Sequence, residues 1–99
     1  MKLQMHSIHF DADKKLVDFI EKRTKKLEKY YNRIIDGEVF LRIIKNGNHH
    51  NKVAEIKLNI PGTQLFAKEH SDTFEEATDL AVNAIRRQLK KHKDRLKAH

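Results

Sequence analysis

The last quarter of the chain, residues 74–99, has the hydrophobic pattern of one long helix. Apolar residues recur there every three or four positions, which is the spacing that lines up side chains along one side of a helix. We therefore expect this side to pack on a core, while charged residues occupy the other sides. The core-facing side is formed by Phe74, Ala77, Ala81, Ile85, Gln88 and Leu89.

Three stretches before this helix have strand periodicity. They cover residues 38–46, 52–60 and 63–70, and apolar residues alternate with others in each of them. The connections contain the turn-forming pairs Asn46-Gly47 and Pro61-Gly62, so the strands are expected to form an antiparallel meander. The side chains expected to face the core are Val39, Leu41 and Ile43 in the first strand, Ala54, Ile56, Leu58 and Ile60 in the second, and Leu65 and Ala67 in the third.

The chain begins with a further strand and a further helix. The alternation over residues 2–8 predicts a short strand. A helix is expected over residues 14–31, capped by Asp11 or Asp13, because an aspartate oxygen there satisfies a free backbone N–H. The turn residues Asp36-Gly37 are expected to end it. The core-facing residues are Leu3 and Met5 in the strand and Leu16, Ile20, Thr24, Leu27 and Tyr31 in the helix, with Ile34 continuing this side.

The order of the predicted elements is strand, helix, three strands and helix. Asp72 or Thr73 is expected to cap the final helix, and Thr73 and Glu76 have the spacing of a capping box. Each helix has one apolar side, so we predict a two-layer α+β fold in which both helices pack on one face of a four-stranded, mostly antiparallel sheet. Residues 1–99 contain no linker, repeat or low-complexity stretch and are expected to form a single domain.

The composition restricts the class of protein. The chain contains no cysteine, which excludes disulfides, thiolate catalysis and sulfur-ligated metal sites. Its first residues are too polar for a signal peptide, and no apolar run approaches the roughly 20 residues of a membrane helix, so we expect a soluble, cytoplasmic protein. A formal net charge of +7 favours an anionic partner, and nucleic acid is favoured over an anionic membrane surface, so we expect no membrane partner.

The positive charge is concentrated on the two helices. A basic helix surface is often only solvated, but like charges four residues apart destabilise a helix by about a few tenths of a kcal/mol per pair. Because the last helix repeats this cost, we infer a polyanionic partner, and nucleic-acid phosphates are the simplest candidate. The cations on the first helix are Lys15, Lys22, Lys25, Lys26 and Lys29, and Arg33 follows its end on the same side. The cations on the last helix are Arg86, Lys90, Lys93 and Lys97 on one side of its apolar face, and Arg87, Lys91 and Arg95 on the other side.

Catalytic and metal-binding patterns are absent from the sequence. There is no acid and base pair, nucleophile motif or glycine-rich phosphate loop, so we expect neither an enzyme nor a cofactor or small-molecule substrate. The histidines lack metal-ligand spacing, and the adjacent His49 and His50 lie in a loop. His92 lies near the apolar side of the last helix, where it can either pack or hydrogen-bond RNA.

Aromatic side chains offer a second way to bind nucleic acid, because exposed rings stack on bases. Phe40 and Ile44 alternate away from the predicted core, and Tyr30, Tyr31 and Phe66 are further candidates. Each ring can be a base platform, a protein contact or an ordinary surface aromatic. Recognition of a structured RNA backbone through charge fits the pattern better.

Two stretches resemble a known family. KKLEKYYNRI at residues 25–34 and DLAVNAIRRQLKKHKDRLKAH at residues 79–99 are similar to the bacterial ribosome hibernation promoting factors, also called the ribosomal subunit interface protein family. The resemblance covers essentially the whole chain, and the RQLKKHKDRLK segment is highly specific. It implies a β-α-β-β-β-α fold, similar in layout to double-stranded RNA-binding domains.

The resemblance also implies a function and a site. Family members bind the small ribosomal subunit in the channel for mRNA and tRNA, beside ribosomal proteins, and silence translation under stress. Their basic helices face rRNA phosphates. Arg86 stands where relatives often carry an acid, and Ala84 where they often carry lysine. The positions implied to contact RNA are Lys22, Arg23, Lys26, Lys29, Arg87, Lys90, Lys91, Lys93 and Arg95, and the charge pattern of the last helix adds Arg86 to this set.

The chain is similar to the short form of this family, which promotes ribosome dimers only with a separate small factor. Two other hypotheses stay open from the residues alone. One is a generic double-stranded RNA-binding module. The other is a protein-binding regulatory module that uses the surface around Phe40, Ile44 and Phe66.

Overall fold

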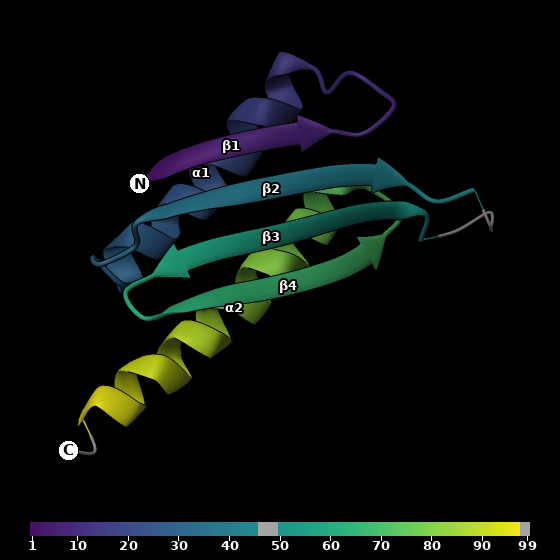
Figure 1. Cartoon of the computed structure of the whole chain (residues 1–99). Helices are drawn as coiled ribbons and strands as arrows, with labels where there is room; N and C mark the ends of the chain where they lie inside the picture. Colours follow the sequence, from purple (N-terminus) through teal and green to yellow (C-terminus); the bar gives the residue numbers. More distant parts are fainter. Residues whose placement is uncertain (46–49, 98–99) are drawn as a thin grey trace.

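The secondary-structure elements follow one another in the predicted order, β-α-β-β-β-α (Figure 1), which confirms the α+β class. The computed structural model describes residues 1–45 and 50–97, so the predicted Asn46-Gly47 turn lies outside the described residues. The elements are β1 (Lys2–Ser7), α1 (Lys14–Tyr30), β2 (Asp36–Ile43), β3 (Lys52–Ile60), β4 (Thr63–Ser71) and α2 (Phe74–Lys97).

One four-stranded sheet forms the first layer, with its strands in the order β1-β2-β3-β4. β1 is parallel to β2, whereas β2, β3 and β4 form the predicted antiparallel meander. The register aligns one apolar residue from each strand in a row across the sheet, namely Met5, Val39, Ile56 and Ala67. This row belongs to the face that packs on the helices.

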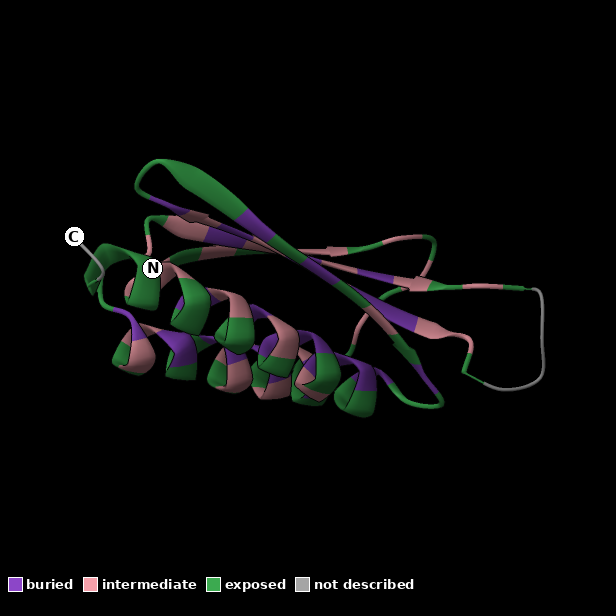
Figure 2. Cartoon of the chain, turned by 90° about the horizontal axis from the view of Figure 1, so that it is seen from below, coloured by how far each residue is buried: buried purple, intermediate pink, exposed green. Residues whose placement is uncertain are grey.

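Both helices cover the same face of the sheet, as predicted (Figure 2). Ile20 and Leu27 of α1 join Ile85 and Leu89 of α2 in the core, and each of these side chains is at most 2% exposed. The chain therefore buries one apolar side of each helix against one side of the sheet. Within the part of the chain that the structure describes, no helix is both long and apolar enough to cross a membrane.

Two residues on the predicted apolar sides do not enter the core. Ile43 is 45% exposed, because it is the last residue of β2, whose end runs past the helices (Figure 2). Gln88 is half-buried at the edge of the sheet. Its amide nitrogen donates to the Phe66 carbonyl at 2.8 Å, and its amide oxygen accepts from the Phe66 N–H at 3.3 Å. Gln88 therefore satisfies backbone groups that the edge strand β4 would otherwise leave unpaired.

The prediction that Asp36-Gly37 ends the first helix is wrong. α1 ends at Tyr30, and both residues lie in β2, where the Asp36 carboxylate accepts a hydrogen bond from the Asn59 amide at 2.6 Å. A Cβ atom on Gly37 would lie 3.0 Å from the Leu58 side chain. Gly37 therefore allows close packing between neighbouring strands.

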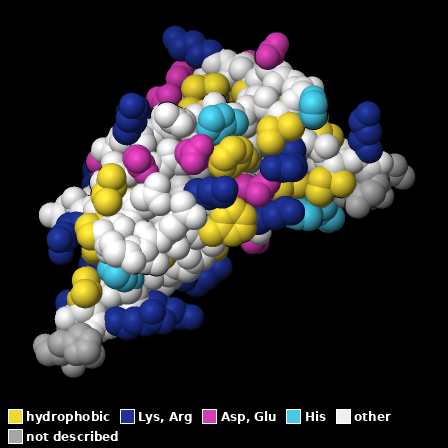
Figure 3. Space-filling view, in the orientation of Figure 1, with side chains coloured by type: hydrophobic (Ala, Val, Ile, Leu, Met, Phe, Trp, Pro, Cys, Tyr) yellow, Lys and Arg dark blue, Asp and Glu magenta, His cyan; other side chains and the backbone are white. Residues whose placement is uncertain are grey.

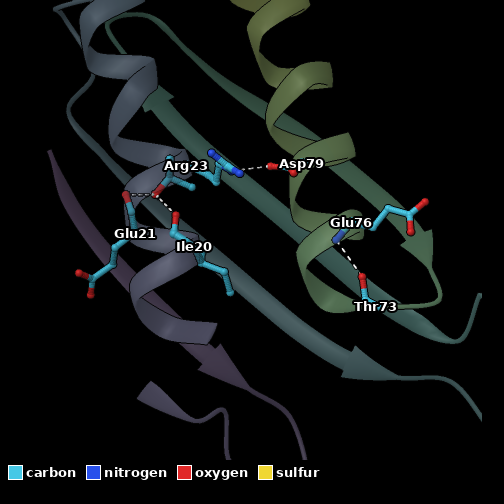
Figure 4. A network of polar contacts seen from close by, with 7 residues as sticks. Ile20, Glu21, Arg23, Thr73, Glu76 and Asp79 are labelled. Carbon is cyan, nitrogen blue, oxygen red and sulfur yellow. Dashed lines mark hydrogen bonds and ion pairs between the residues drawn. The ribbon is translucent and has the colours of Figure 1, made fainter. Parts of the chain in front are cut away.

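The helix caps follow the sequence signals. The Asp13 carboxylate accepts from the Leu16 N–H at 2.8 Å, which identifies Asp13 as the cap of α1. At the start of α2, the Thr73 hydroxyl oxygen accepts from the Glu76 N–H at 3.1 Å (Figure 4). Thr73 is therefore the residue that caps α2, the longer of the two basic helices.

Replacing this cap should destabilise the fold moderately. We expect Thr73→Ala to lower the free energy of unfolding by about 1 kcal/mol, because the Glu76 N–H loses its acceptor. Thr73→Ser keeps a hydroxyl and should stay near the wild type. Urea unfolding of both variants measures the difference, and equal losses would show that the hydroxyl is not what matters.

Candidate nucleic-acid interface

The two helices run in the same direction. Because β1 and β2 are parallel, α1 must return along the sheet between them, and α2 returns in the same way from the end of β4. The C-terminal ends of both helices therefore lie toward the same end of the molecule (Figure 1). Cations are concentrated in the second half of each helix, so this arrangement brings the two basic segments side by side.

A groove runs between these basic segments. It consists of three adjoining hollows of about 620, 410 and 410 Å³, and Tyr30 lines all of them. Leu27 and Val82 form part of its floor, and Asn83 adds an amide. The cations along the groove are Arg23, Lys26, Lys29, Arg86, Arg87, Lys90, Lys93 and Lys97. A groove with positive walls on both sides is suited to a polyanion.

Tyr30 connects the two walls of the groove. The Lys93 Nζ atom lies 4.5 Å from the centroid of the Tyr30 ring and donates a hydrogen bond to the Tyr30 carbonyl at 3.1 Å. The guanidinium carbon of Arg86 lies 5.4 Å from the same ring. Both distances fall within the range of cation–π attraction. The C-terminal end of α1 thus holds two cations of α2.

Arg23 forms the other connection. Its Nε atom lies 3.0 Å from a carboxylate oxygen of Asp79 (Figure 4), and its guanidinium carbon lies 4.6 Å from the Phe19 ring centroid. The contact with Asp79 is an ion pair by distance only, because Nε lacks hydrogen-bond geometry toward any acceptor among residues 1–45 and 50–97. Since both side chains are partly exposed, the pair adds little stability. It does fix where the guanidinium lies.

The structure brings together most of the residues predicted to contact RNA. Arg23, Lys26, Lys29, Arg86, Arg87, Lys90 and Lys93 line the groove. Lys22, Lys91 and Arg95 are exposed but are not among the residues that line the three hollows. The predicted set therefore divides into a groove group and an outer group.

Sequence reasoning missed three members of the groove. The charge pattern does not indicate Asn83 or Asp79 as site residues, and it indicates Tyr30 only as a ring that can stack on bases. A signal for Tyr30 was present, because it follows Arg23 by seven residues, or about two helical turns. Lys97 lies on the same side of the predicted apolar face as Lys93 and also lines the groove.

The open face of the sheet has a different character. Phe40 stacks on His6 with ring centroids 4.7 Å apart, and the Lys57 ammonium lies 5.3 Å from the Phe40 centroid. These partners come from the strands on either side of β2, so the Phe40 ring is poorly placed to receive a base. Arg42 also pairs with Glu55 at 2.8 Å. Acidic and basic side chains are mixed over this face (Figure 3), which makes it a weaker candidate for a polyanion.

His92 packs at the junction of the two helices. Its ring meets the buried Tyr31 ring edge-on, with centroids 5.8 Å apart. Of the two roles predicted for His92, the structure shows packing. The described residues contain no group of three or more His, Asp or Glu side chains arranged to hold a metal ion.

The chain is similar in sequence to ribosome hibernation factors of several bacteria. The chain is 30% identical over 94 residues to the ribosome hibernation promotion factor of Deinococcus radiodurans, covering 93% of this chain and 49% of that protein. It is 28% identical over 99 residues to the ribosome hibernation promoting factor of Escherichia coli (strain K12), covering 100% of both chains. The chain thus spans about half the length of the first relative and the whole length of the second.

The fold and the family agree with these matches. A ribosomal subunit interface protein from Coxiella burnetii has the same fold, with a TM-score of 0.85 at 23% identity over 95% of this chain and 99% of that chain. Residues 3–97 match the model of one family over nearly the whole chain. The resemblance seen in the two helices is confirmed, and the chain belongs to the Sigma 54 modulation protein / S30EA ribosomal protein family.

Proposed function

We propose that this protein is a ribosome hibernation factor that binds rRNA of the small ribosomal subunit and occupies the channel for mRNA and tRNA. The observation that carries the proposal is the groove between α1 and α2, which is lined by cations from both helices. The names of the relatives from Deinococcus radiodurans and Escherichia coli support the ribosome as the polyanion. The proposed contacts include the groove group and, at its margins, Lys22, Lys91 and Arg95.

Binding through this groove depends on charge more than on base reading. Each Lys or Arg that meets a phosphate releases condensed counterions, which favours association without regard to sequence. The deep groove of A-form RNA cannot be read by side chains, so contacts to phosphates and 2′-hydroxyls dominate there. The last turns of α2 project beyond the sheet (Figure 1), and a single helix about 10–12 Å wide can enter a cleft that the whole domain cannot.

This role also accounts for other properties of the chain. Competition for the channel needs no catalytic step and no cofactor, since occupancy alone excludes mRNA and tRNA. The protein would act in the cytoplasm as a single ribosome-binding domain over residues 1–99. It would contact rRNA and neighbouring ribosomal proteins, and a separate ribosome-dimerising factor is a further candidate partner.

Cosedimentation with small subunits over a range of salt concentrations tests the proposal. We expect the logarithm of the affinity to fall linearly with the logarithm of salt, by about 0.7 to 0.9 per phosphate neutralised. Bound tRNA should be released as the protein binds. Affinity that is independent of salt, or tRNA that stays bound beside the protein, would contradict the proposed site.

A competition experiment tests whether the protein prefers the ribosome to RNA in general. A long RNA duplex without ribosomal sequence should displace the protein from small subunits only at a large excess. Equal affinity for the duplex and the subunit would instead indicate a generic double-stranded RNA-binding module. Nuclease treatment of a lysate should abolish the association with subunits if rRNA carries it.

A further inference from the structure

We infer that Tyr30 is the positioning residue of this interface, holding Arg86 and Lys93 ready for one stretch of phosphate backbone. The inference rests on the proposed function and adds a residue that acts through other residues. Tyr30 lies at the last position of α1, half-buried, and lines every hollow of the groove.

Two independent contacts fix Lys93 on Tyr30. The ammonium lies over the ring at 4.5 Å and donates to the backbone carbonyl at 3.1 Å. An ammonium has three donors, so it can still donate to a ligand while one donor bonds to the carbonyl and another side faces the ring. The carbonyl belongs to the last turn of α1, whose terminal carbonyls lack partners inside the helix. Lys93 thus joins the helices and can still donate a hydrogen bond to a ligand.

Arg86, which lies before Lys93 in α2, contacts the same Tyr30 ring. Its guanidinium carbon lies 5.4 Å from the Tyr30 centroid. Guanidinium groups that lie over an aromatic face keep the planar fork of N–H donors that suits a phosphate. Arg86 and Lys93 are seven residues, or about two turns, apart on α2, so one ring orders two cations along the same side of the helix.

Ordering these side chains in advance should raise affinity. Lys and Arg have the largest rotamer entropies, and a binding partner that must immobilise them loses part of the interaction energy. In the free protein, Tyr30 already restricts both side chains. The ring is therefore used to present charge, and with two cations over it, it is not free to act as a platform for bases.

Substitutions at Tyr30 separate these roles. Tyr30→Leu removes the ring and should weaken binding to small subunits by about tenfold, because both cations must then be ordered on binding. Tyr30→Phe keeps the ring and the carbonyl and should bind like the wild type. A large loss in Tyr30→Phe would overturn the inference, because it would assign the effect to the hydroxyl group. Phe66→Leu is the control, because it removes an exposed aromatic ring from the open face of the sheet. This variant should bind small subunits as tightly as the wild type.

A double-mutant cycle with Lys93→Gln shows whether Tyr30 acts through Lys93. The loss caused by Lys93→Gln should be smaller in the Tyr30→Leu background than in the wild type. Additive losses would overturn the inference and indicate that Tyr30 contacts RNA itself. Each variant is first checked by circular dichroism and urea unfolding, and the cycle uses only the affinities of folded proteins.

A measurement on the free protein keeps the inference separate from the proposed function. Protons next to the Lys93 ammonium should show ring-current shifts in NMR spectra, and these shifts should disappear in Tyr30→Leu but persist in Tyr30→Phe. Their absence in the wild type would overturn the inference, whatever the protein binds. Failure of the wild type to bind subunits, with the shifts present, would instead contradict the proposed function.

Discussion

Reversing the three groove cations Arg86, Lys90 and Lys93 of α2 to glutamate is expected to abolish binding to small ribosomal subunits. A cation about 4 Å from a phosphate gains about 1 kcal/mol even at the dielectric constant of water, and reversal turns this gain into a similar cost. Three reversals therefore change the binding free energy by about 6 kcal/mol, which is more than a thousandfold in affinity. Cosedimentation and filter binding measure this loss.

The matched control reverses three cations that do not line the groove. Lys22, Lys91 and Arg95 are exposed, and changing them to glutamate alters the net charge by the same amount. This variant loses contacts at the margins of the groove and part of the long-range field, so it should bind more weakly than the wild type, but it should retain measurable affinity because the groove itself is unchanged. Equal loss in the two triple variants would show that total charge, and not the groove, determines binding.

The integrity of the fold is checked before the two variants are compared. Arg86, Lys90 and Lys93 lie outside the buried core, so their reversal should leave the circular dichroism spectrum unchanged. Lys93→Glu does break the hydrogen bond to the Tyr30 carbonyl and places an acid near a helix C-terminus. A modest loss of stability is therefore expected in the groove variant, and affinities are compared at a temperature where both variants are folded.

Local patterns predicted the elements of the fold because those elements depend on local spacing. In β3, Ala54, Ile56 and Leu58 alternate with polar residues, and all three are fully buried in the structure. The same local reasoning failed at Asp36-Gly37, where turn propensity suggested a helix end. Gly37 is required there by its neighbours in the sheet, and packing between strands does not show in the local sequence.

The groove could be predicted only in part, because it depends on how distant segments are aligned. Sequence patterns identified the two basic helices and the cations on each side of the apolar face of α2. The contact of Lys93 with Tyr30 joins residues 63 positions apart, and it exists because both helices return along the sheet in the same direction. This direction follows from the parallel pairing of β1 and β2, which the alternation in each strand does not specify.

The stability of the basic segment is expected to depend on Leu89 more than on any cation. Leu89 is completely buried and lies between Arg86 and Lys93 in sequence. Leu89→Ala should lower the free energy of unfolding by about 2–5 kcal/mol, through lost transfer energy and the cavity left behind. Urea unfolding should show this as a lower midpoint with an unchanged slope.

Leu96→Ala is the matched control on the same helix. Leu96 is 54% exposed, so the same change should cost less than about 0.5 kcal/mol. Beyond Leu89, no described residue of α2 is buried, and Lys93 holds the last turns to α1. A loss in Leu96→Ala as large as that in Leu89→Ala would mean that these turns pack more tightly than their exposure indicates. The expected difference would show that the end of α2 contributes little to the core, so its side chains serve another purpose than stability.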